Sequence, residues 1–371
     1  MRLFTNATLI LSLNLAIISS GCNHPPHGQE ESKDSTFLRS GAIVGAIRWD
    51  GWVGPLNKAG LEVEYTLGPH QYHHRAPFYS QEIAFDSIQC RGTTQAIMDK
   101  EISYAKYGGI DYWAFCWYPP HTGLDTARQL YLASAHKGDV NWCVILGTNP
   151  FDYQVDGQWL VGQFKTPFYQ KVLNGRPLVF LFPSNDTKAA QIARLRTLSK
   201  EAGVADPYIV AMAFSAKDAD SISHTLGANA VSSYASTYNY ETGEQFNKVN
   251  YAPAVGESDQ AGWLQYKANG KKLVPWITAG WNPKPRIERS VSWGAYYKSN
   301  GWAGEATPGE IAQHVQDAVT WTKDHGDAAE ANAVLIYAWN EFDEGGWLCP
   351  TFGEDTSRLK AIRAVLRKEG N

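Results

Sequence analysis

The sequence predicts a (β/α)8 barrel over most of its 371 residues. From residue 44 onward, short β-branched or aromatic runs alternate with longer stretches that carry apolar residues at helical spacing, as in β–α units around a parallel sheet. Eight such runs occur, and most are continuously apolar, as strands covered on both faces are. An open, doubly wound sheet is the alternative fold. It would require a glycine-rich turn after an early strand, and the sequence contains neither G-x-G-x-x-G nor a P-loop.

The expected strands and helices alternate along the chain. Strands are predicted at residues 44–49, 110–117, 142–147, 177–182, 208–213, 230–235, 273–279 and 333–339. Helices are predicted at residues 94–107, 125–137, 166–173, 187–202, 216–226, 259–269, 308–324 and 356–368. The helix at 308–324 has the clearest start, because Thr307 is an N-cap candidate, Pro308 takes the first helical position and Glu310 lies in the first turn.

The first residues predict export and a lipid anchor. Arg2 gives a short positive start, residues 9–18 are apolar but too few to span a bilayer, and small residues precede Cys22. We therefore expect residues 1–21 to be a lipoprotein signal peptide and Cys22 to be lipidated, on a protein anchored in the bacterial cell envelope that faces the periplasm or the exterior. An ordinary signal peptide with an incidental cysteine is the alternative. Residues 22–40 are polar and aperiodic and predict a flexible tether, which leaves residues 41–371 for the barrel.

The composition favours a glycan over a nucleic acid as partner. Lys and Arg total 33 against 37 Asp and Glu, the net charge is -4, and no long basic run could follow a phosphate backbone. Aromatic residues make up 13% of the chain, with 14 Trp and 19 Tyr, which suits a cleft that stacks sugar rings. A tryptophan-rich core would explain the same composition.

The four cysteines after Cys22 are not expected to be catalytic or metal-binding. Cys116 and Cys143 lie in apolar runs, where a thiol behaves as a small core hydrophobe. Cys90 and Cys349 lie in predicted loops of an exported protein, so one disulfide is conceivable, but spacing alone does not establish it.

Two glutamates at the end of the eighth strand are the candidate catalytic residues. The active site of such a barrel lies at the C-terminal ends of its strands, where Glu341 and Glu344 precede Gly345 and Gly346. Paired carboxylates are what glycoside hydrolysis needs, one to protonate the leaving oxygen and one to assist attack at the anomeric carbon. A solvated acidic loop explains the spacing equally well. Asp343, between them, is interpreted as supporting or solvent-facing.

Aromatic, amide and charged residues at or after the strand ends are the candidate contacts to substrate. They are Trp49, Asp50, Trp117, Tyr118, Asn149, Tyr153, Tyr234, Tyr238, Trp281, Arg286, Trp339, Asn340 and Trp347. Core packing explains some of them, Asp50 is as often a turn residue, and Arg286 could pair with an acidic sugar or cap its own loop.

Histidines near the first strand are not expected to bind a metal. His70, His73 and His74 lie close together, but no acidic ligand accompanies them at a suitable spacing, so a loop role is favoured. No cofactor is expected either. Asp111, at the start of the second strand, faces the opposite end of the barrel and is interpreted as structural.

Four blocks of sequence carry a resemblance to a known family. "GIDYWAFCWY" (109–118), "GRPLVFLF" (175–182), "AGWNPKPR" (279–286) and "AWNEFDEGGWLCPT" (338–351) resemble successive blocks of the family 99-like glycoside hydrolases. That group includes the WbsX proteins and is similar to the endo-α-mannosidases of glycoside hydrolase family 99. The last block, with its W-N-E-x-x-E-G pattern, is the most specific.

The resemblance implies a fold and a division of labour. The fold would be a (β/α)8 barrel, and a Glu-x-x-Glu pair would hydrolyse the glycoside with retention. Glu341 would take the proton of the sugar 2-hydroxyl, and Glu344 would act first as acid and then as base, with a 1,2-anhydro sugar as intermediate. A retaining mechanism predicts that the two carboxyl groups lie about 5 to 6 Å apart.

Two departures from the family pattern weaken any inference about the sugar. Cys349 occupies a position where many relatives carry a supporting glutamate, and the Trp-Asp-Asn of the seventh block reads Trp281-Asn282-Pro283. Mannose specificity is therefore not carried over. Two other functions remain: a polysaccharide glycosyltransferase, which the export signal disfavours because nucleotide sugars are cytoplasmic, and a non-catalytic glycan-binding lipoprotein.

Overall fold

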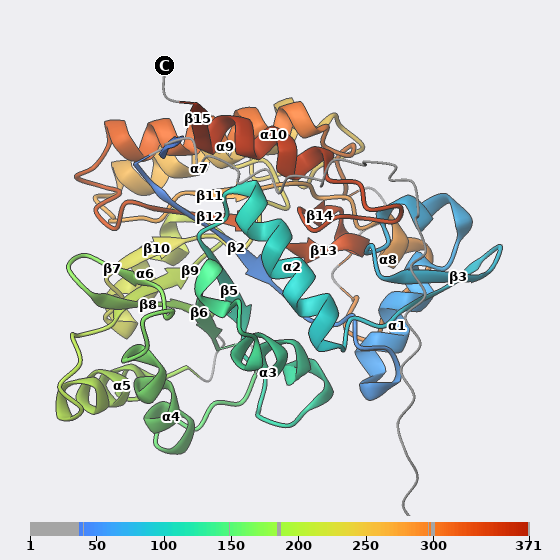
Figure 1. Ribbon diagram of the computed structural model, residues 1–371. Helices are drawn as coiled ribbons and strands as arrows, with labels where there is room; N and C mark the ends of the chain where they lie inside the picture. Colours follow the sequence, from blue (N-terminus) through green and yellow to red (C-terminus); the bar gives the residue numbers. More distant parts are fainter. Residues whose placement is uncertain are drawn as a thin grey trace, which may run out of the picture. The chain divides into compact units, whose positions relative to one another are not determined.

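Eight parallel strands form a closed barrel in the computed structural model of the chain (Figure 1). They are β2 (Ile43–Arg48), β5 (Tyr112–Cys116), β6 (Asn141–Leu146), β8 (Arg176–Leu181), β9 (Tyr208–Met212), β10 (Ala230–Ser232), β11 (Trp276–Thr278) and β12 (Ala333–Tyr337). β12 pairs with β2, and the ring closes between β10 and the residues before β11, where Val231 donates to Lys272 and Val274 donates to Val231, both at 2.9 Å. The predicted fold is confirmed, and the open sheet is excluded.

The structure describes residues 37–39, 41–147, 149–183, 187–295, 297 and 301–369. The predicted signal peptide, Cys22 and most of the predicted tether lie outside these residues. Residues 37–39, at the end of the predicted tether, form β1 (Phe37–Arg39), which pairs antiparallel with β15 (Arg367–Glu369). Within the described residues, no helix combines the length and the apolar character that crossing a bilayer requires.

The barrel strands form where the sequence is continuously apolar. All five residues of β5 and all five of β12 are buried, because helices cover the outside of the sheet while side chains fill its interior. Each of the eight predicted runs overlaps one of these strands, with β2, β6 and β8 beginning one residue before the predicted start, so all eight strand predictions are confirmed.

Helices follow the strands around the outside of the barrel (Figure 1). They are α2 (Gln95–Gly108), α3 (Thr126–Ala133), α4 (Val155–Phe164), α5 (Ala189–Glu201), α6 (Ala216–Leu226), α7 (Glu257–Ala268), α9 (Pro308–Asp324) and α10 (Ser357–Leu366). α6 and α9 match their predicted bounds, and α9 begins with the expected cap, in which the Thr307 hydroxyl accepts from the Glu310 N–H. The others except α4 overlap their predicted ranges.

The helix predicted at residues 166–173 is wrong. These residues contain β7 (Lys171–Val172), which pairs antiparallel with β8. Leu173, Asn174 and Gly175 all have positive φ, which forms the tight turn between the two strands and ends any helix. The helix lies earlier, at α4, whose Gly157 and Gly162 have low helix propensity and weakened its pattern in the sequence.

Shorter elements fill the long loops between strands and helices. After β2 come η1 (Gly54–Leu56), α1 (Lys58–Leu67), η2 (His70–Arg75) and the hairpin of β3 (Ser80–Ala84) and β4 (Ser87–Cys90). After β11 comes α8 (Lys284–Glu288), and after β12 come β13 (Asn340–Glu341), η6 (Phe342–Glu344) and β14 (Gly346–Trp347). Single turns elsewhere are η3 (Gly123–Asp125), η4 (Lys137–Asp139) and the π-helical η5 (Ala252–Gly256).

The four described cysteines are free and buried. Cys143 lies in β6, as a packing residue should, and Cys116 lies at the end of β5. The conceivable disulfide between Cys90 and Cys349 is absent. Cys90 ends β4, where its sulfur lies 3.1 Å from the Ser80 hydroxyl, and Cys349 follows β14.

Candidate active site

The segment after β12 folds back on itself and buries its three acids. β13 and β14 pair as a short antiparallel hairpin, and Gly345 takes a φ of 88° between η6 and β14. Glycine is needed there, because a Cβ atom on Gly345 would lie 2.8 Å from the backbone nitrogen of Asn282. Glu341, Asp343 and Glu344 are only 3, 0 and 4% exposed. The alternative of a solvated acidic loop is therefore wrong.

Arg286 of α8 holds the three carboxyl groups together. Its Nε and Nη2 donate to the two oxygens of Asp343 at 2.7 and 2.8 Å. Nη1 donates to Glu344, and Nη2 also lies 3.3 Å from Glu341. Such forked, charge-assisted hydrogen bonds offset the cost of burying carboxylates. Arg286 therefore pairs with the chain's own acids and does not cap its own loop.

Tyrosine hydroxyls bind the two glutamates. Tyr234, which follows β10, donates to Glu341 at 3.1 Å. Tyr297 and Tyr337 each donate to a different oxygen of Glu344. Both glutamate side chains are thus held in fixed orientations by groups from β12, α8 and the loops after β10 and α8, as a preorganised site requires.

Asp343 supports the other charges and does not face solvent. It accepts hydrogen bonds from Nε and Nη2 of Arg286. It also accepts one, at 2.9 Å, from the hydroxyl of Thr66, at the end of α1. This is the supporting role that the sequence allowed.

The electrostatics of the cluster favour a proton on Glu341. Burial raises the pKa of Glu341 well above its ordinary value, the negative charge of Glu344 raises it further, and Arg286 opposes both effects. Three acids share one guanidinium, so the cluster is most stable when one of them is neutral. Glu341 therefore keeps a proton at a pH where an ordinary glutamate has lost it.

A cavity of about 420 Å³ opens beside the two glutamates. Its walls come from several strand ends, as expected for a barrel of this type. The lining residues are Trp49, Cys116, Tyr118, Phe182, Phe214, Tyr234, Ala235, Thr237, Trp281, Arg286, Trp293, Glu341 and Glu344. Trp49 donates its indole N–H to the Tyr118 hydroxyl at 2.6 Å, which fixes two of the aromatic walls. The size and the aromatic lining suit a sugar ring.

The structure brings five of the thirteen predicted substrate contacts to this cavity. They are Trp49, Tyr118, Tyr234, Trp281 and Arg286. The other eight are not among the described residues that line it: Asp50, Trp117, Asn149, Tyr153, Tyr238, Trp339, Asn340 and Trp347.

Some of these eight support the cavity from behind. Asn340 accepts the backbone N–H of Trp49 at 2.9 Å and donates to Asp50 at 3.2 Å. Asn149 donates to the backbone carbonyl of Trp117 at 2.9 Å. These contacts hold the strand ends that carry Trp49 and Tyr118.

The aromatic members of the eight pack against other side chains. Trp117 lies 4.0 Å beneath the Arg128 guanidinium and Trp347 lies 3.5 Å beneath that of Arg358, measured from each ring centroid. Trp339 is fully buried. The remaining ring pairs are Tyr153 with Phe151 and Tyr238 with Tyr240. Trp117, Trp339 and Trp347 are buried, as the explanation by core packing requires, whereas Tyr153 and Tyr238 are half-buried.

Several site residues were not predicted from the sequence. Phe182, Phe214, Thr237 and Trp293 line the cavity, and Thr66, Tyr297 and Tyr337 contact the acids. Phe182 directly follows β8 and Tyr337 ends β12, so position at a strand end could have identified both. Thr66 lies in α1, within the long connection after β2, and Trp293 lies in the loop after α8; the sequence carries no comparable signal for either.

The two positions that depart from the family pattern lie behind the cavity. Asn282 is not among the described residues that line the cavity. Its side chain donates to the Ala303 carbonyl, and its backbone N–H donates to the Glu344 carbonyl at 2.6 Å. The Cys349 thiol lies 3.5 Å from Glu101 of α2. Asp111 accepts the Val44 N–H at 2.9 Å, as its structural interpretation requires.

Comparison with known families now identifies the chain's relatives. The family model described as "Glycosyltransferase WbsX" matches residues 152–362, more than half of the chain. The chain belongs to this family. Three of the four sequence blocks, at 175–182, 279–286 and 338–351, lie within the matched residues. A comparison with curated proteins found no match.

Solved structures of glycoside hydrolases share the fold. A GH99 endo-alpha-mannosidase from Bacteroides thetaiotaomicron, in complex with BIS-TRIS-Propane, is similar at a TM-score of 0.57 and 14% identity, over 87% of this chain and 95% of that one. A second structure of the GH99 endo-alpha-mannosidase from that organism gives 0.52 and 13% over the same shares. The chain is thus a member of the WbsX family, and its barrel has the same fold as these GH99 endo-alpha-mannosidase structures.

Proposed function

We propose that this chain is an exported glycoside hydrolase, anchored to the cell envelope by a lipid on Cys22, that cleaves a poly- or oligosaccharide with retention. One observation carries the proposal. Glu341 and Glu344 are buried beside an aromatic cavity at the C-terminal ends of the barrel strands, and both are hydrogen-bonded to the guanidinium of Arg286. Paired carboxyl groups at a sugar-sized cavity are the arrangement that glycoside hydrolysis needs.

The shared arginine supports retention over inversion. Glu344 binds Nη1 of Arg286 and Glu341 lies beside Nη2 of the same group, so the two carboxyl groups sit side by side. Retaining enzymes hold their carboxyl groups roughly 5–5.5 Å apart, whereas inverting enzymes leave roughly 6.5–9.5 Å for a water molecule.

The division of roles between the glutamates has two versions. The family resemblance gives proton donation to Glu344 and deprotonation of the 2-hydroxyl to Glu341. The raised pKa of Glu341 supports the reverse, because a proton donor must be protonated before the bond breaks. Both versions require the pair to hold one proton between them.

The first experiment measures cleavage of a polysaccharide panel by wild type, Glu341→Gln and Glu344→Gln. We expect each variant to lower kcat/KM about 10²–10⁴-fold on the glycan that the wild type cleaves. Glu354→Gln is the matched control, since Glu354 is exposed and pairs with Lys100. Undiminished cleavage in both cavity variants would contradict the proposal.

A second experiment assigns the roles. An activated aryl glycoside needs little protonation of its leaving group, so the variant that lacks the acid should keep near-wild-type kcat/KM on it, because kcat/KM reports the first step. The variant that lacks the base should stay slow on both substrates. Rescue of Glu344→Gln supports the family assignment, and rescue of Glu341→Gln supports the reverse.

A transferase is the second candidate, because the family is described as a glycosyltransferase. A transferase needs an activated sugar donor, whereas a hydrolase releases reducing sugar from glycan and water alone. Sugar release without any nucleotide sugar supports hydrolysis. Glycan binding without product, with or without a nucleotide sugar, supports the non-catalytic lipoprotein.

The lipid anchor has its own test. Radiolabelled palmitate should be incorporated into the wild type but not into Cys22→Ala, and the variant should leave the membrane fraction. Equal labelling of both proteins would remove Cys22 from the proposal while leaving the hydrolase intact.

A further inference from the structure

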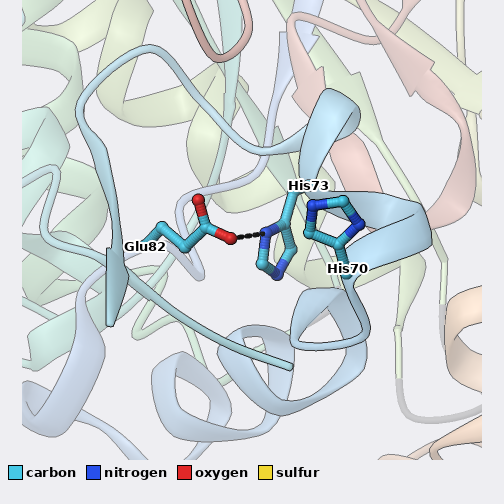
Figure 2. Close-up of side chains that lie close together, drawn as sticks. All are labelled: His70, His73 and Glu82. Atoms are coloured by element: carbon cyan, nitrogen blue, oxygen red, sulfur yellow. Dashed lines mark ion pairs between the residues drawn. The ribbon is translucent and has the colours of Figure 1, made fainter. Parts of the chain in front are cut away.

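A second group of chemically active side chains lies on the long connection between β2 and α2. It consists of His70 and His73 of η2 and Glu82 of β3 (Figure 2). One ligand atom from each residue lies within 4.8 Å of the other two. The two imidazoles are neighbours because a 3₁₀-helix has three residues per turn, which places positions i and i+3 on one face.

The hydrogen bonds of His73 define which ring nitrogen has a free lone pair. Nε2 lies 2.8 Å from the carbonyl oxygen of Gly68, which can only accept, so Nε2 carries the hydrogen. In a neutral imidazole Nδ1 is then an acceptor. Nδ1 is buried, has no hydrogen-bond partner among the described residues, and lies 3.3 Å from Glu82 Oε1. Two acceptors that face each other at this distance need a positive charge between them.

The distance between the two acceptor atoms fits a metal ion. A tetrahedral zinc ion with ligands at about 2.0–2.1 Å separates neighbouring ligand atoms by about 3.3 Å. The observed separation of Nδ1 and Oε1 matches that value.

The rest of the group also resembles a metal site. The His70 ring stacks on Phe85, with centroids 4.6 Å apart and planes at 8°, which holds it beside His73. His70 and Glu82 are exposed, so both can move toward an ion that His73 binds first. The Gly68 carbonyl is the kind of outer partner that fixes the tautomer of a metal-binding histidine.

We propose that His70, His73 and Glu82 bind a divalent zinc-class ion, with water as the fourth ligand. The ion joins η2 to the β3–β4 hairpin and acts as a structural clip. Gly68 caps α1, the helix whose Thr66 binds Asp343, so the clip lies at the helix end that supports the acid cluster. The spacing of the histidines did not predict this site, because Glu82 lies on a separate strand.

The experiment uses the full chain, purified without a histidine tag and stripped with a chelator. Equilibrium dialysis against ZnCl₂ measures bound zinc in wild type, His70→Ala, Glu82→Gln and His74→Ala. His74→Ala is the matched control, because His74 lies on the same turn but pairs with Glu305. The chain has ten histidines, so the comparison between variants carries the result.

We expect one tight zinc equivalent in wild type and in His74→Ala, with affinity at least about 10-fold weaker in the other two variants. Co²⁺ should give intense visible absorption, typical of tetrahedral coordination, in wild type and His74→Ala alone. Zinc should also raise Tm in those two proteins. His70→Ala and Glu82→Gln should keep the wild-type circular dichroism spectrum, since both altered side chains are exposed. Equal zinc binding in all four proteins, or none in the wild type, would overturn the proposal.

Discussion

Arg286 and Arg48 are both buried and each pairs with more than one acid, but of these two only Arg286 lines the cavity. Arg286 binds Glu341, Asp343 and Glu344. Arg48, at the end of β2, donates to Asp50 at 2.8 Å and to Glu101 at 2.5 Å.

Burial and ion pairing are therefore common to both clusters and do not mark the active site. Two differences separate them. The Arg286 cluster has three acids for one cation, while the Arg48 cluster has two. Glu341 and Glu344 line the cavity, whereas Asp50 and Glu101 are not among the described residues that do. Because the Arg286 cluster has more acids than cations and two of its acids line the cavity, it can hold a proton where a substrate can use it. The Arg48 cluster also has more acids than cations, but neither acid is among the described residues that line the cavity, so this cluster contributes to the structure of the strand ends.

The largest expected effect comes from replacing Arg286. Arg286→Met leaves three buried carboxyl groups without their cation, which should lower the free energy of unfolding by about 3–5 kcal/mol at neutral pH. Without the guanidinium the acids must bind protons to stay buried, so their folded-state pKa values rise above the unfolded ones. The loss should therefore be smaller at pH 5 than at pH 8, measured by urea unfolding.

Arg48→Met is the comparison variant for that experiment. This variant leaves two buried acids without a cation instead of three, so it should destabilise the protein less. A larger loss in Arg48→Met, or a loss from Arg286→Met that does not change with pH, would contradict the distinction between the two clusters.

The sequence could predict the barrel and the glutamate pair but not the arginine that holds the pair. Continuous apolar runs locate the strands, and chain position after the eighth strand places Glu341 and Glu344 at the mouth. Arg286 is 55 positions from Glu341. No local sequence pattern predicts that the segment after β11, which carries Arg286, packs against the end of β12.

Adjacent aromatic residues were harder to assign than the acids. Cys116 and Tyr118 line the cavity, while Trp117 between them packs beneath Arg128. Successive side chains of an extended segment point to opposite sides, so alternation separates these residues once the side that faces the cavity is known. Composition alone could not show which of the tryptophans face sugar and which fill the core.

The second prediction concerns Asp50 and the pH dependence of stability. Burial raises the pKa of Asp50 from 3.8 to about 6, against the opposing effect of Arg48. Between about pH 4 and 6 the folded state then binds a proton more readily than the unfolded state, so stability falls as pH rises through this window. Relative to Asp50→Asn, which cannot titrate, wild type should lose about 2 kcal/mol between pH 4 and pH 7.

Urea unfolding of both proteins across that range provides the measurement. A constant difference between wild type and Asp50→Asn, or a wild type that gains stability as pH rises, would contradict the raised pKa of Asp50. The same variant tests the predicted substrate contact: because Asp50 does not line the cavity, kcat/KM on a cleaved glycan should stay within about 10-fold of wild type.

The smallest expected effect concerns Cys349, at the far side of the Arg48 cluster. Burial raises the pKa of its thiol well above the ordinary value, so the sulfur keeps its proton and can donate to Glu101. Cys349→Ala removes this donor, and the free energy of unfolding should fall by about 1 kcal/mol. Cys349→Ser keeps a donor and should lose less. Because Glu101 also binds Arg48 and Trp339, its charge stays compensated in either variant. A loss of several kcal/mol in Cys349→Ala would instead mean that this thiol, like Arg286 at the mouth, is essential to the charge balance of its cluster.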